Sequence, residues 1–342
     1  MRKVVAVGPS LVDISMTLAD ARFTRFCQTA GVVAGEWREI VSEDNFERLL
    51  AELDVLNFEE LLTVPQTHFT AVAGGSTLSM LAALEPAIRC VATYVSVLAL
   101  RGGVLTPVAS FFAREICAMG IMHSSPLLEG VNPTGLVVAG TRNPEKILLF
   151  YPGVSRSSAG MDLDALAPDL LIVDAYELQQ GDLAEMLHRC IEARRFRIAL
   201  SLGNHVILVG RTLRRLLDHI RMGRIFAIAG NLAEYRTLMP DVSESYLTHF
   251  GFSSHPIRHF VPFSLLTMGE GGMVANWRNV SAAADAVPVR SEDIVNTSGA
   301  GDAAAGVFFV GAINNKPLGE TLSRAAQMAS RVLKVPGSLV LG

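Results

Sequence analysis

The stretch "IVNTSGAGDAAAGVFFVGAI", residues 294–313, joins a glycine-rich segment and one aspartate to a long apolar run. It could be a dinucleotide-binding loop, a P-loop, or an anion hole at the start of a helix. A dinucleotide fingerprint needs G-x-G-x-x-G directly after a strand, whereas the spacing here is G-x-G-x-x-x-x-G. A P-loop ends in Gly-Lys-Ser/Thr, and no lysine occurs between Arg290 and Lys316. The first two interpretations are therefore disfavoured.

The third interpretation, an anion hole at the start of a helix, fits the sequence better. Gly299 and Gly301 tolerate positive φ and carry no side chain, so the N–H groups of Gly299, Ala300 and Gly301 can point at one anion. The segment "AAAGVFFVGAI" then forms a helix whose dipole faces that anion. The charge of Asp302 would repel a bound phosphate, so an aspartate at this position suggests a catalytic role. It is placed to take a proton from an attacking hydroxyl as a general base. The plainer alternative is a turn followed by an aspartate that the dipole favours.

The rest of the chain predicts an α/β fold. Half of its 342 residues are hydrophobic and 18% are charged, which is typical of a globular protein. Short strand-like runs alternate with amphipathic helical patterns, which predicts a mainly parallel sheet covered by helices on both faces. In "TPVASFFAREICAMG", for example, Thr106 is the expected N-cap, Pro107 the first helical residue and Gly120 the residue beyond the end.

Two segments interrupt this alternation. Residues 14–70 contain one helical stretch, "SEDNFERLLAEL", between weakly strand-like runs. Residues 135–151 predict a β-hairpin that turns at Asn143–Pro144. Together these pieces predict a small second sheet.

Several classes of protein are disfavoured by composition. No apolar run approaches the roughly 20 residues that a membrane helix needs, and Pro9 and Asp13 interrupt any signal-peptide core near the N-terminus. A cytoplasmic protein is therefore expected. The four cysteines contain no C-x-x-C pair and are expected to be buried free thiols. A net charge of −4 gives no electrostatic reason to expect a nucleic-acid partner.

The segment "NTSGAGDAAAGVFFVGA" resembles the C-terminal signature of the ribokinase-like (PfkB) sugar and nucleoside kinases, in which D-T-x-G-A-G-D supplies an anion hole and a catalytic base. The resemblance implies an ATP-dependent kinase acting on a primary hydroxyl, with Asp302 as base. Asn296 replaces the first aspartate of the signature and removes a charge near the monovalent-cation site of many members. Backbone carbonyls are then the ligands that could still hold potassium.

Two further segments resemble the acceptor-binding parts of this family. "AVGPSLVDI" matches a first-strand motif whose aspartate, here Asp13, binds sugar hydroxyls, and the alternative is a surface turn aspartate. "AGGSTLSMLAAL" matches the di-glycine that approaches the sugar, Gly74 and Gly75, and its G-G-S-T resembles the adenosine kinase branch. The family's following asparagine is missing, and Ser79 and Met80 are the candidates at its position, of which Ser79 is the candidate contact. A plain helix-entry turn is the alternative for this segment.

Two more segments resemble the nucleotide-binding parts. "GNLAEYRTL" matches the N-x-x-E motif that organises magnesium-bound water and phosphates, through Asn231 and Glu234. An N-cap followed by an exposed helical glutamate explains it equally well. "LLTMGEGGMVA" resembles the turn along the nucleotide phosphates, and a glycine hairpin is its alternative. The candidate contacts in that turn are Thr267, Gly269 and Gly272.

The resemblance implies a ribokinase-like three-layer α/β/α main domain and a small β-sheet lid that excludes water from phosphoryl transfer. The main domain is expected in residues 1–13, 71–133 and 154–342, and the lid in residues 14–70 and 134–153. The edges of such a lid could pair two copies into a homodimer. Phe150 and Tyr151 in the lid would either stack on a nucleobase or belong to the core.

The acceptor stays open between a sugar and a nucleoside. The altered acceptor contacts also keep a second function in view: a kinase-fold protein that binds a nucleoside or nucleotide as a sensor or partner without efficient transfer. The intact G-A-G-D sequence favours the kinase, because an anion hole beside a base serves transfer better than binding.

Overall fold

The chain forms two compact units in a computed structural model. The main unit contains Met1–Gly8, Ser76–Val95 and Met161–Gly342, and the small unit contains Pro9–Gly75 and Ser96–Gly160. The small unit thus includes both ranges expected for a lid, together with residues 9–13, 71–75, 96–133 and 154–160. The structure describes residues 2–33, 37–53, 69–84, 90–141, 146–242, 257–295 and 297–335.

The sheet of the main unit has its strands in the order β17-β16-β15-β14-β13-β12-β1-β5. From β5 to β15 neighbouring strands are parallel, and β16 and β17 continue the sheet in antiparallel pairs. All residues of β12 and β13 are buried, as expected for parallel strands covered on both faces. The strands are β1 (Arg2–Val7), β5 (Cys90–Val95), β12 (Leu170–Asp174), β13 (Ile198–Ser201), β14 (Ala227–Asn231), β15 (Phe263–Thr267), β16 (Met273–Trp277) and β17 (Val280–Ala284).

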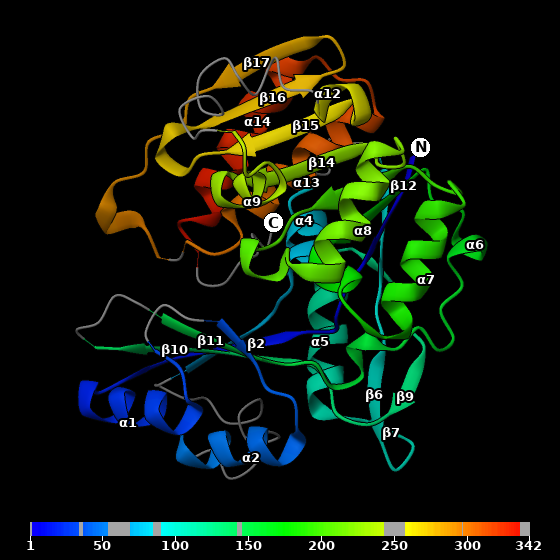
Figure 1. The fold of residues 1–342 in the computed structure, drawn as a ribbon. Helices are drawn as coiled ribbons and strands as arrows, with labels where there is room; N and C mark the ends of the chain where they lie inside the picture. Colours follow the sequence, from blue (N-terminus) through cyan, green and yellow to red (C-terminus); the bar gives the residue numbers. More distant parts are fainter. Residues whose placement is uncertain are drawn as a thin grey trace. The chain divides into compact units, whose positions relative to one another are not determined.

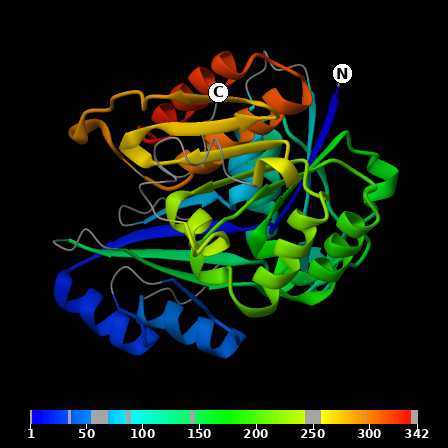
Figure 2. The same cartoon turned by 45° about the horizontal axis from the view of Figure 1, so that its top comes forward.

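Helices cover both faces of this sheet. Figures 1 and 2 show α7 and α8 on one face and α4, α13 and α14 on the other. The α-helices of the unit are α4 (Ser76–Ala82), α6 (Leu163–Leu166), α7 (Gly181–Glu192), α8 (Gly210–Arg221), α9 (Leu232–Leu238), α12 (Ile257–Phe260), α13 (Ala300–Ile313) and α14 (Leu318–Val332). Its short 3₁₀ turns are η2 (Ala175–Leu178), η3 (His205–Ile207), η5 (Gly269–Gly271) and η6 (Ser291–Asp293). The predicted three-layer fold with a mostly parallel sheet is confirmed.

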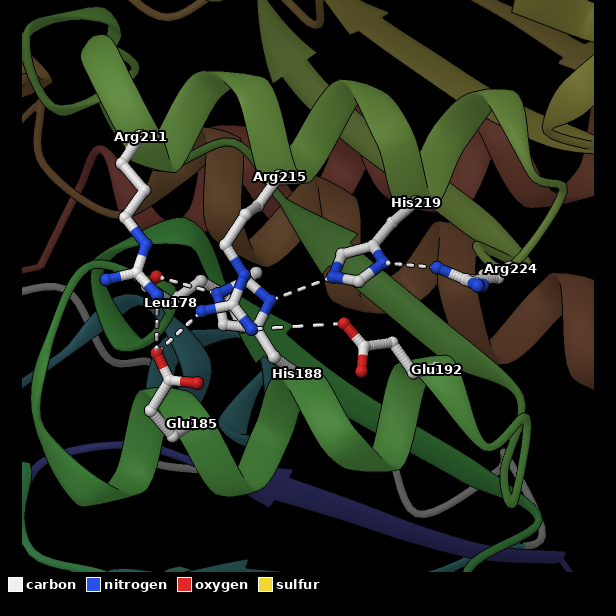
Figure 3. Close-up of polar contacts among 8 residues, drawn as sticks. All are labelled: Leu178, Glu185, His188, Glu192, Arg211, Arg215, His219 and Arg224. Atoms are coloured by element: carbon white, nitrogen blue, oxygen red, sulfur yellow. Dashed lines mark hydrogen bonds and ion pairs between the residues drawn. The ribbon is translucent and has the colours of Figure 1, made fainter.

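Two buried histidines join α7 to α8 (Figure 3). His188 Nε2 donates to the Leu178 carbonyl at 3.1 Å, and His188 Nδ1 lies 2.8 Å from His219 Nε2. Arg224 Nη1 lies 3.4 Å from His219 Nδ1. If both rings are neutral, each nitrogen has one role: Arg224 donates to His219, His219 to His188, and His188 to the carbonyl.

Ion pairs surround the histidines on the same two helices. Glu185 accepts from Arg215 at 2.6 Å and from Arg211 at 3.4 Å, and Glu192 lies 3.9 Å from Arg215. Apart from the partly buried Arg215, these side chains are exposed to solvent, where an ion pair contributes little to stability. The buried histidine chain is therefore the more specific link between the helices.

The small unit is built around a five-stranded sheet in the order β3-β11-β10-β2-β4. In Figure 1 the helices α1 and α2 lie along one face of this sheet. A separate three-stranded sheet has the order β7-β6-β9. The strands are β2 (Val12–Leu18), β3 (Trp37–Glu39), β4 (Phe69–Ala73), β6 (Leu98–Arg101), β7 (Val104–Leu105), β8 (Met122–Ser124), β9 (Leu127–Glu129), β10 (Thr134–Gly140) and β11 (Lys146–Tyr151). The helical elements are α1 (Asp20–Ala30), α2 (Glu43–Glu52), α5 (Pro107–Ala118) and η1 (Gly153–Arg156).

Several local predictions in this unit are confirmed. α5 begins after Thr106, whose side chain accepts from Ala109 N at 3.2 Å. The hairpin is present as antiparallel β10 and β11, and its expected turn at Asn143–Pro144 lies outside the described residues. The ring of Tyr151 stacks on Phe46 of α2 with centroids 4.9 Å apart, so Tyr151 belongs to the packing between sheet and helix.

Two expectations were incomplete. α1 was not predicted, because it lacks a side-chain N-cap and buries only Phe23 and Phe26, too few apolar positions for a clear helical period. The four cysteines are free, as expected, but Cys117 is exposed and only Cys190 is buried.

Among the described residues, no helix is long and apolar enough to cross a membrane.

Candidate active site

Asp302 lies in the first turn of α13. The helix begins at Ala300 after Gly299, which has a φ of 81°, and its first hydrogen bond runs from Ala303 N to Gly299 O at 2.8 Å. The preceding N–H groups therefore have no acceptor inside the helix. Only Gly299 uses a positive φ here, whereas Gly301 is helical and has Thr267 Oγ1 as the nearest atom to a Cβ built on it, at 3.9 Å.

The environment of Asp302 makes it a stronger base than an ordinary aspartate. Burial raises the pKa of its carboxyl to about 6, and a hydrogen bond from the Ser76 side chain acts in the opposite direction. A carboxylate with a pKa near the working pH is suited to accept a proton and release it again. The position is also near the positive end of the dipole of α13, which favours the ionised form.

Asn231 and Glu234 form a capping box at the start of α9. The Asn231 side chain accepts from Glu234 N at 3.0 Å, while Glu234 accepts from Asn231 N at 2.9 Å and from Asn231 Nδ2 at 2.6 Å. Glu234 is only 5% exposed, so the alternative of an exposed helical glutamate is wrong. Burial raises the pKa of Glu234 to about 7, and the charge of Asp302 adds to this effect. The hydrogen bond from Asn231 N acts in the opposite direction and lowers the pKa.

The next strand brings Thr267 beside Asn231. These two residues are register partners at the ends of β14 and β15, and Thr267 Oγ1 donates to Gly230 O at 3.4 Å. The chain then turns through Gly269, with a φ of 57°, and Gly272, with a φ of 79°, into β16. A Cβ at Gly272 would lie 2.3 Å from Ala284 O, so the hairpin itself requires that glycine.

Asp174 is a further candidate site residue, which the sequence analysis did not name. It ends β12, is 3% exposed, and accepts from Tyr176 N at 2.8 Å through Oδ1. Its Oδ2 has no hydrogen-bond partner among the described residues. Burial first and Asp302 next raise its pKa well above the ordinary value. An acidic residue at the carboxyl end of a buried parallel strand was the available signal, because ligands bind at that edge of α/β sheets.

Asp174, Glu234 and Asp302 therefore form a group of buried carboxyls within electrostatic reach of one another. In the described part of the chain, no three His, Cys, Asp or Glu side chains are placed to hold a metal directly. Magnesium commonly keeps several waters and binds proteins through one or two carboxylates. The carboxylate chemistry and the unpaired Oδ2 of Asp174 thus fit a magnesium ion held through water.

The predicted acceptor residues of the small unit lie around Asp13 in β2. A Cβ built at Gly74 would lie 2.1 Å from Asp13 Oδ2, and one at Gly135 would lie 2.1 Å from Asp13 Oδ1. Burial raises the pKa of Asp13 to about 6. Asp13 is a partly buried strand residue, so the alternative of a surface turn is wrong, and Gly135 is a neighbour that sequence reasoning missed.

Three further candidates are Gly75, Ser79 and Asn296. Gly75 follows Gly74 with a φ of 102°, which explains why glycine is needed at the entry to α4. Ser79 is buried inside α4 of the main unit. Asn296, the candidate for a monovalent cation, lies outside the described residues.

Comparison with known proteins gives a family match over most of the chain. The family described as "pfkB family carbohydrate kinase" matches residues 54–340. No curated protein matches the sequence.

Solved structures share the fold at low sequence identity. The chain is similar to adenosine kinase from Sinorhizobium meliloti, with a TM-score of 0.78, 18% identity, and 100% of this chain and 96% of that chain covered. A probable sugar kinase from Rhizobium etli gives a TM-score of 0.77, 18% identity, and coverage of 99% and 94%. Adenosine kinase from Schistosoma mansoni in complex with 2-fluoroadenosine gives 0.72, 14%, and 98% and 96%. With its fold and the family match, the chain belongs to the pfkB family of carbohydrate kinases, phosphotransferases that act on a hydroxyl.

Proposed function

We propose that the protein transfers the γ-phosphoryl group of ATP to a primary hydroxyl of a sugar or nucleoside. The observation that carries this proposal is the position of Asp302 in the first turn of α13, with burial raising its pKa to about 6. A base and a set of outward N–H groups at one helix terminus are the two parts that a phosphoryl transfer to a hydroxyl requires.

In the proposed reaction, Asp302 accepts the proton of the attacking hydroxyl. The oxygen attacks the γ-phosphorus, a new O–P bond forms, and the bond to the β-phosphate oxygen breaks. The N–H groups of Gly299, Ala300 and Gly301 stabilise the negative charge of the transferring group, as at other helix N-termini. General-base catalysis of this kind typically contributes about 10²–10⁴ in rate.

ATP and magnesium are the proposed cofactors. Asn231 and Glu234 would hold magnesium through water, and the ion when bound supplies neutralisation of charge on the β- and γ-phosphate oxygens. Thr267, Gly269 and Gly272 would contact the phosphates. Potassium near Asn296 would be held by backbone carbonyl oxygens, because the asparagine lacks the charge of the aspartate in the family signature.

Asp13 is the proposed ligand of the acceptor hydroxyls. A carboxylate only accepts hydrogen bonds, and its two oxygens suit two adjacent hydroxyls. Gly74 and Gly75 would let the sugar approach the backbone, and Ser79 would replace the family's asparagine. The lid of residues 14–70 and 134–153, and pairing of two copies through its edges, remain predictions.

The proposal is tested with ATP, magnesium and a panel of free pentoses, free hexoses and nucleosides. Phosphorylated product is detected by mass spectrometry, so that contaminating ATP hydrolysis is not counted. We expect product from at least one member of the panel. Nucleotide binding without product from any acceptor would contradict the proposal and support the sensor alternative.

A further inference from the structure

Two buried polar residues join the segments that precede β2 and β10 in the small unit. Asn132 Nδ2 donates a hydrogen bond to the Ser10 carbonyl, and the Ser10 hydroxyl lies 3.2 Å from Asn132 Oδ1. Both side chains are buried. Because the two residues are 122 positions apart in the chain, the pair links distant segments.

This pair continues the register of the two strands that follow it. β2 and β10 are parallel neighbours (Figure 1), with Val12 opposite Thr134 and Asp13 opposite Gly135. Ser10 precedes Val12 by two residues, and Asn132 precedes Thr134 by two. The Ser10–Asn132 pair therefore has the same alignment as the strands and lies directly before them.

The register of β2 against β10 decides where Asp13 lies. In a hairpin a short turn fixes the register, whereas parallel strands are joined by long connections that leave it free. A shift by one residue would turn the side chains of the strand to its other face. Asp13 would then no longer lie beside Gly135, where the lack of a side chain makes room for the carboxylate.

Further hydrogen bonds hold the pair against the segment that contains β6. Asn132 Oδ1 accepts from Ala99 N at 3.2 Å, and the Ser10 hydroxyl donates to the Val97 carbonyl at 2.6 Å. A shifted strand would leave some of these buried polar groups without partners, which is costly. Selecting one register over its alternatives is a role that buried polar residues have in other folds.

We propose that Asn132 is a positioning residue, which together with Ser10 sets the register of β2 against β10 and so holds Asp13 beside Gly135. The inference rests on the proposed function, in which Asp13 binds the acceptor hydroxyls. Without the Asn132 amide, the start of β2 loses its side-chain link to β10, and the Asp13 carboxylate is displaced. The residues proposed to bind ATP belong to the main unit, so the KM for ATP should change little.

The test compares Asn132→Ala with Asn276→Ala, which removes another buried asparagine amide, in β16 of the main unit. Both variants should be less stable than the parent in urea unfolding. Asn132→Ala should also raise the KM of an acceptor that gives product in the panel above, by about tenfold, the size expected for weakening a hydrogen bond to a charged group. Asn276→Ala should leave that KM unchanged, and an equal rise in both variants would overturn the inference.

A milder variant and a measurement without turnover keep the test decisive if Asn132→Ala does not fold. Ser10→Ala keeps the carbonyl that Asn132 contacts and removes the hydroxyl, so it should raise the acceptor KM in the same direction by a smaller factor. Hydrogen exchange measured by mass spectrometry should be faster in residues 12–18 and 134–140 of Ser10→Ala, and unchanged there in Asn276→Ala. Parent-like exchange and an unchanged acceptor KM in Ser10→Ala would contradict the inference.

A double-mutant cycle with Asp13→Asn separates this inference from the proposed function. If Asn132 acts through the Asp13 carboxylate, Asn132→Ala should have little further effect on the acceptor KM in the Asp13→Asn background. The full effect in that background would overturn the positioning role and leave the role of Asp13 in place. An acceptor KM that Asp13→Asn itself does not change would instead overturn the proposed acceptor site.

Discussion

Asp13 occupies the space beside Gly135 so closely that a Cβ at Gly135 would lie 2.1 Å from Asp13 Oδ1. The two residues are register partners in β2 and β10, and Gly74 confines the other carboxylate oxygen in the same way. The Asp13 carboxylate therefore occupies the space that side chains at positions 74 and 135 would otherwise fill. Its conformation depends on glycine at both positions.

The first prediction concerns Gly135→Ala. The new methyl group should displace the Asp13 carboxylate and raise the KM for the acceptor by roughly tenfold or more, because a hydrogen bond to a charged group is lost. The KM for ATP should change little. Steady-state kinetics with both substrates varied measure this, and Gly319→Ala, where a Cβ would meet open space, is the control. An unchanged KM for every acceptor would show that Asp13 does not bind the acceptor.

A second prediction separates two roles of the Asn231–Glu234 pair. Asn231→Ala removes an N-cap, which should cost about 1 kcal/mol of unfolding free energy. If the pair also organises magnesium, Asn231→Ala and Glu234→Gln should both raise the magnesium concentration for half-maximal turnover. Thr237→Ala in the same helix should leave that concentration unchanged. A loss of stability in Asn231→Ala, with a normal magnesium response in both variants, would leave only the capping role.

A third prediction follows from the burial of Asp302. Its pKa is raised from 3.8 to about 6, so the folded state binds a proton more tightly than the unfolded state. The stabilising effect is complete below about pH 4 and is lost as the pH rises through about 6. Asp302→Asn should therefore increase the free energy of unfolding at pH 8, by up to about 3 kcal/mol, and change it much less at pH 4. Urea unfolding at the two pH values checks this, and equal effects at both would contradict it.

A fourth prediction concerns the histidine chain between α7 and α8. Burial, and secondarily His188, lower the pKa of His219 from 6.5 to about 4. As the pH falls, His219 is therefore protonated in the unfolded state before it is protonated in the folded state. The contribution of His219 to stability should fall as the pH decreases from about 6.5 to about 4. In His219→Gln, which can still donate to His188, the fall of unfolding free energy over this range should be shallower. The exposed His205→Gln should behave like the parent, and an equal slope in both variants would contradict the buried neutral state.

Local sequence signals predicted much of the fold. The N-cap at Thr106 and the β10–β11 hairpin depend on neighbouring residues only, and both are present. The position of Asp302 in the first turn of a helix was also predicted from neighbouring residues. Glycines and an aspartate directly before a long apolar run indicate the start of a helix. α1 was missed where these local signals are weak.

The remaining parts of the site depend on contacts between distant segments. The bond from Ser76 to Asp302 spans more than half the chain, and Asp174 joins the group only through the order of the parallel strands. Gly135 lies beside Asp13 only because of the register of β10 against β2. No spacing rule within one segment could have predicted these pairings.

Turnover of Asp302→Asn tests the central proposal most directly. The variant should fold, bind ATP with an affinity close to that of the parent, and phosphorylate the acceptor at least about a hundredfold more slowly, which is the lower end of general-base effects. Turnover within about tenfold of the parent, in a folded protein that binds ATP, would contradict the assignment of Asp302 as the base.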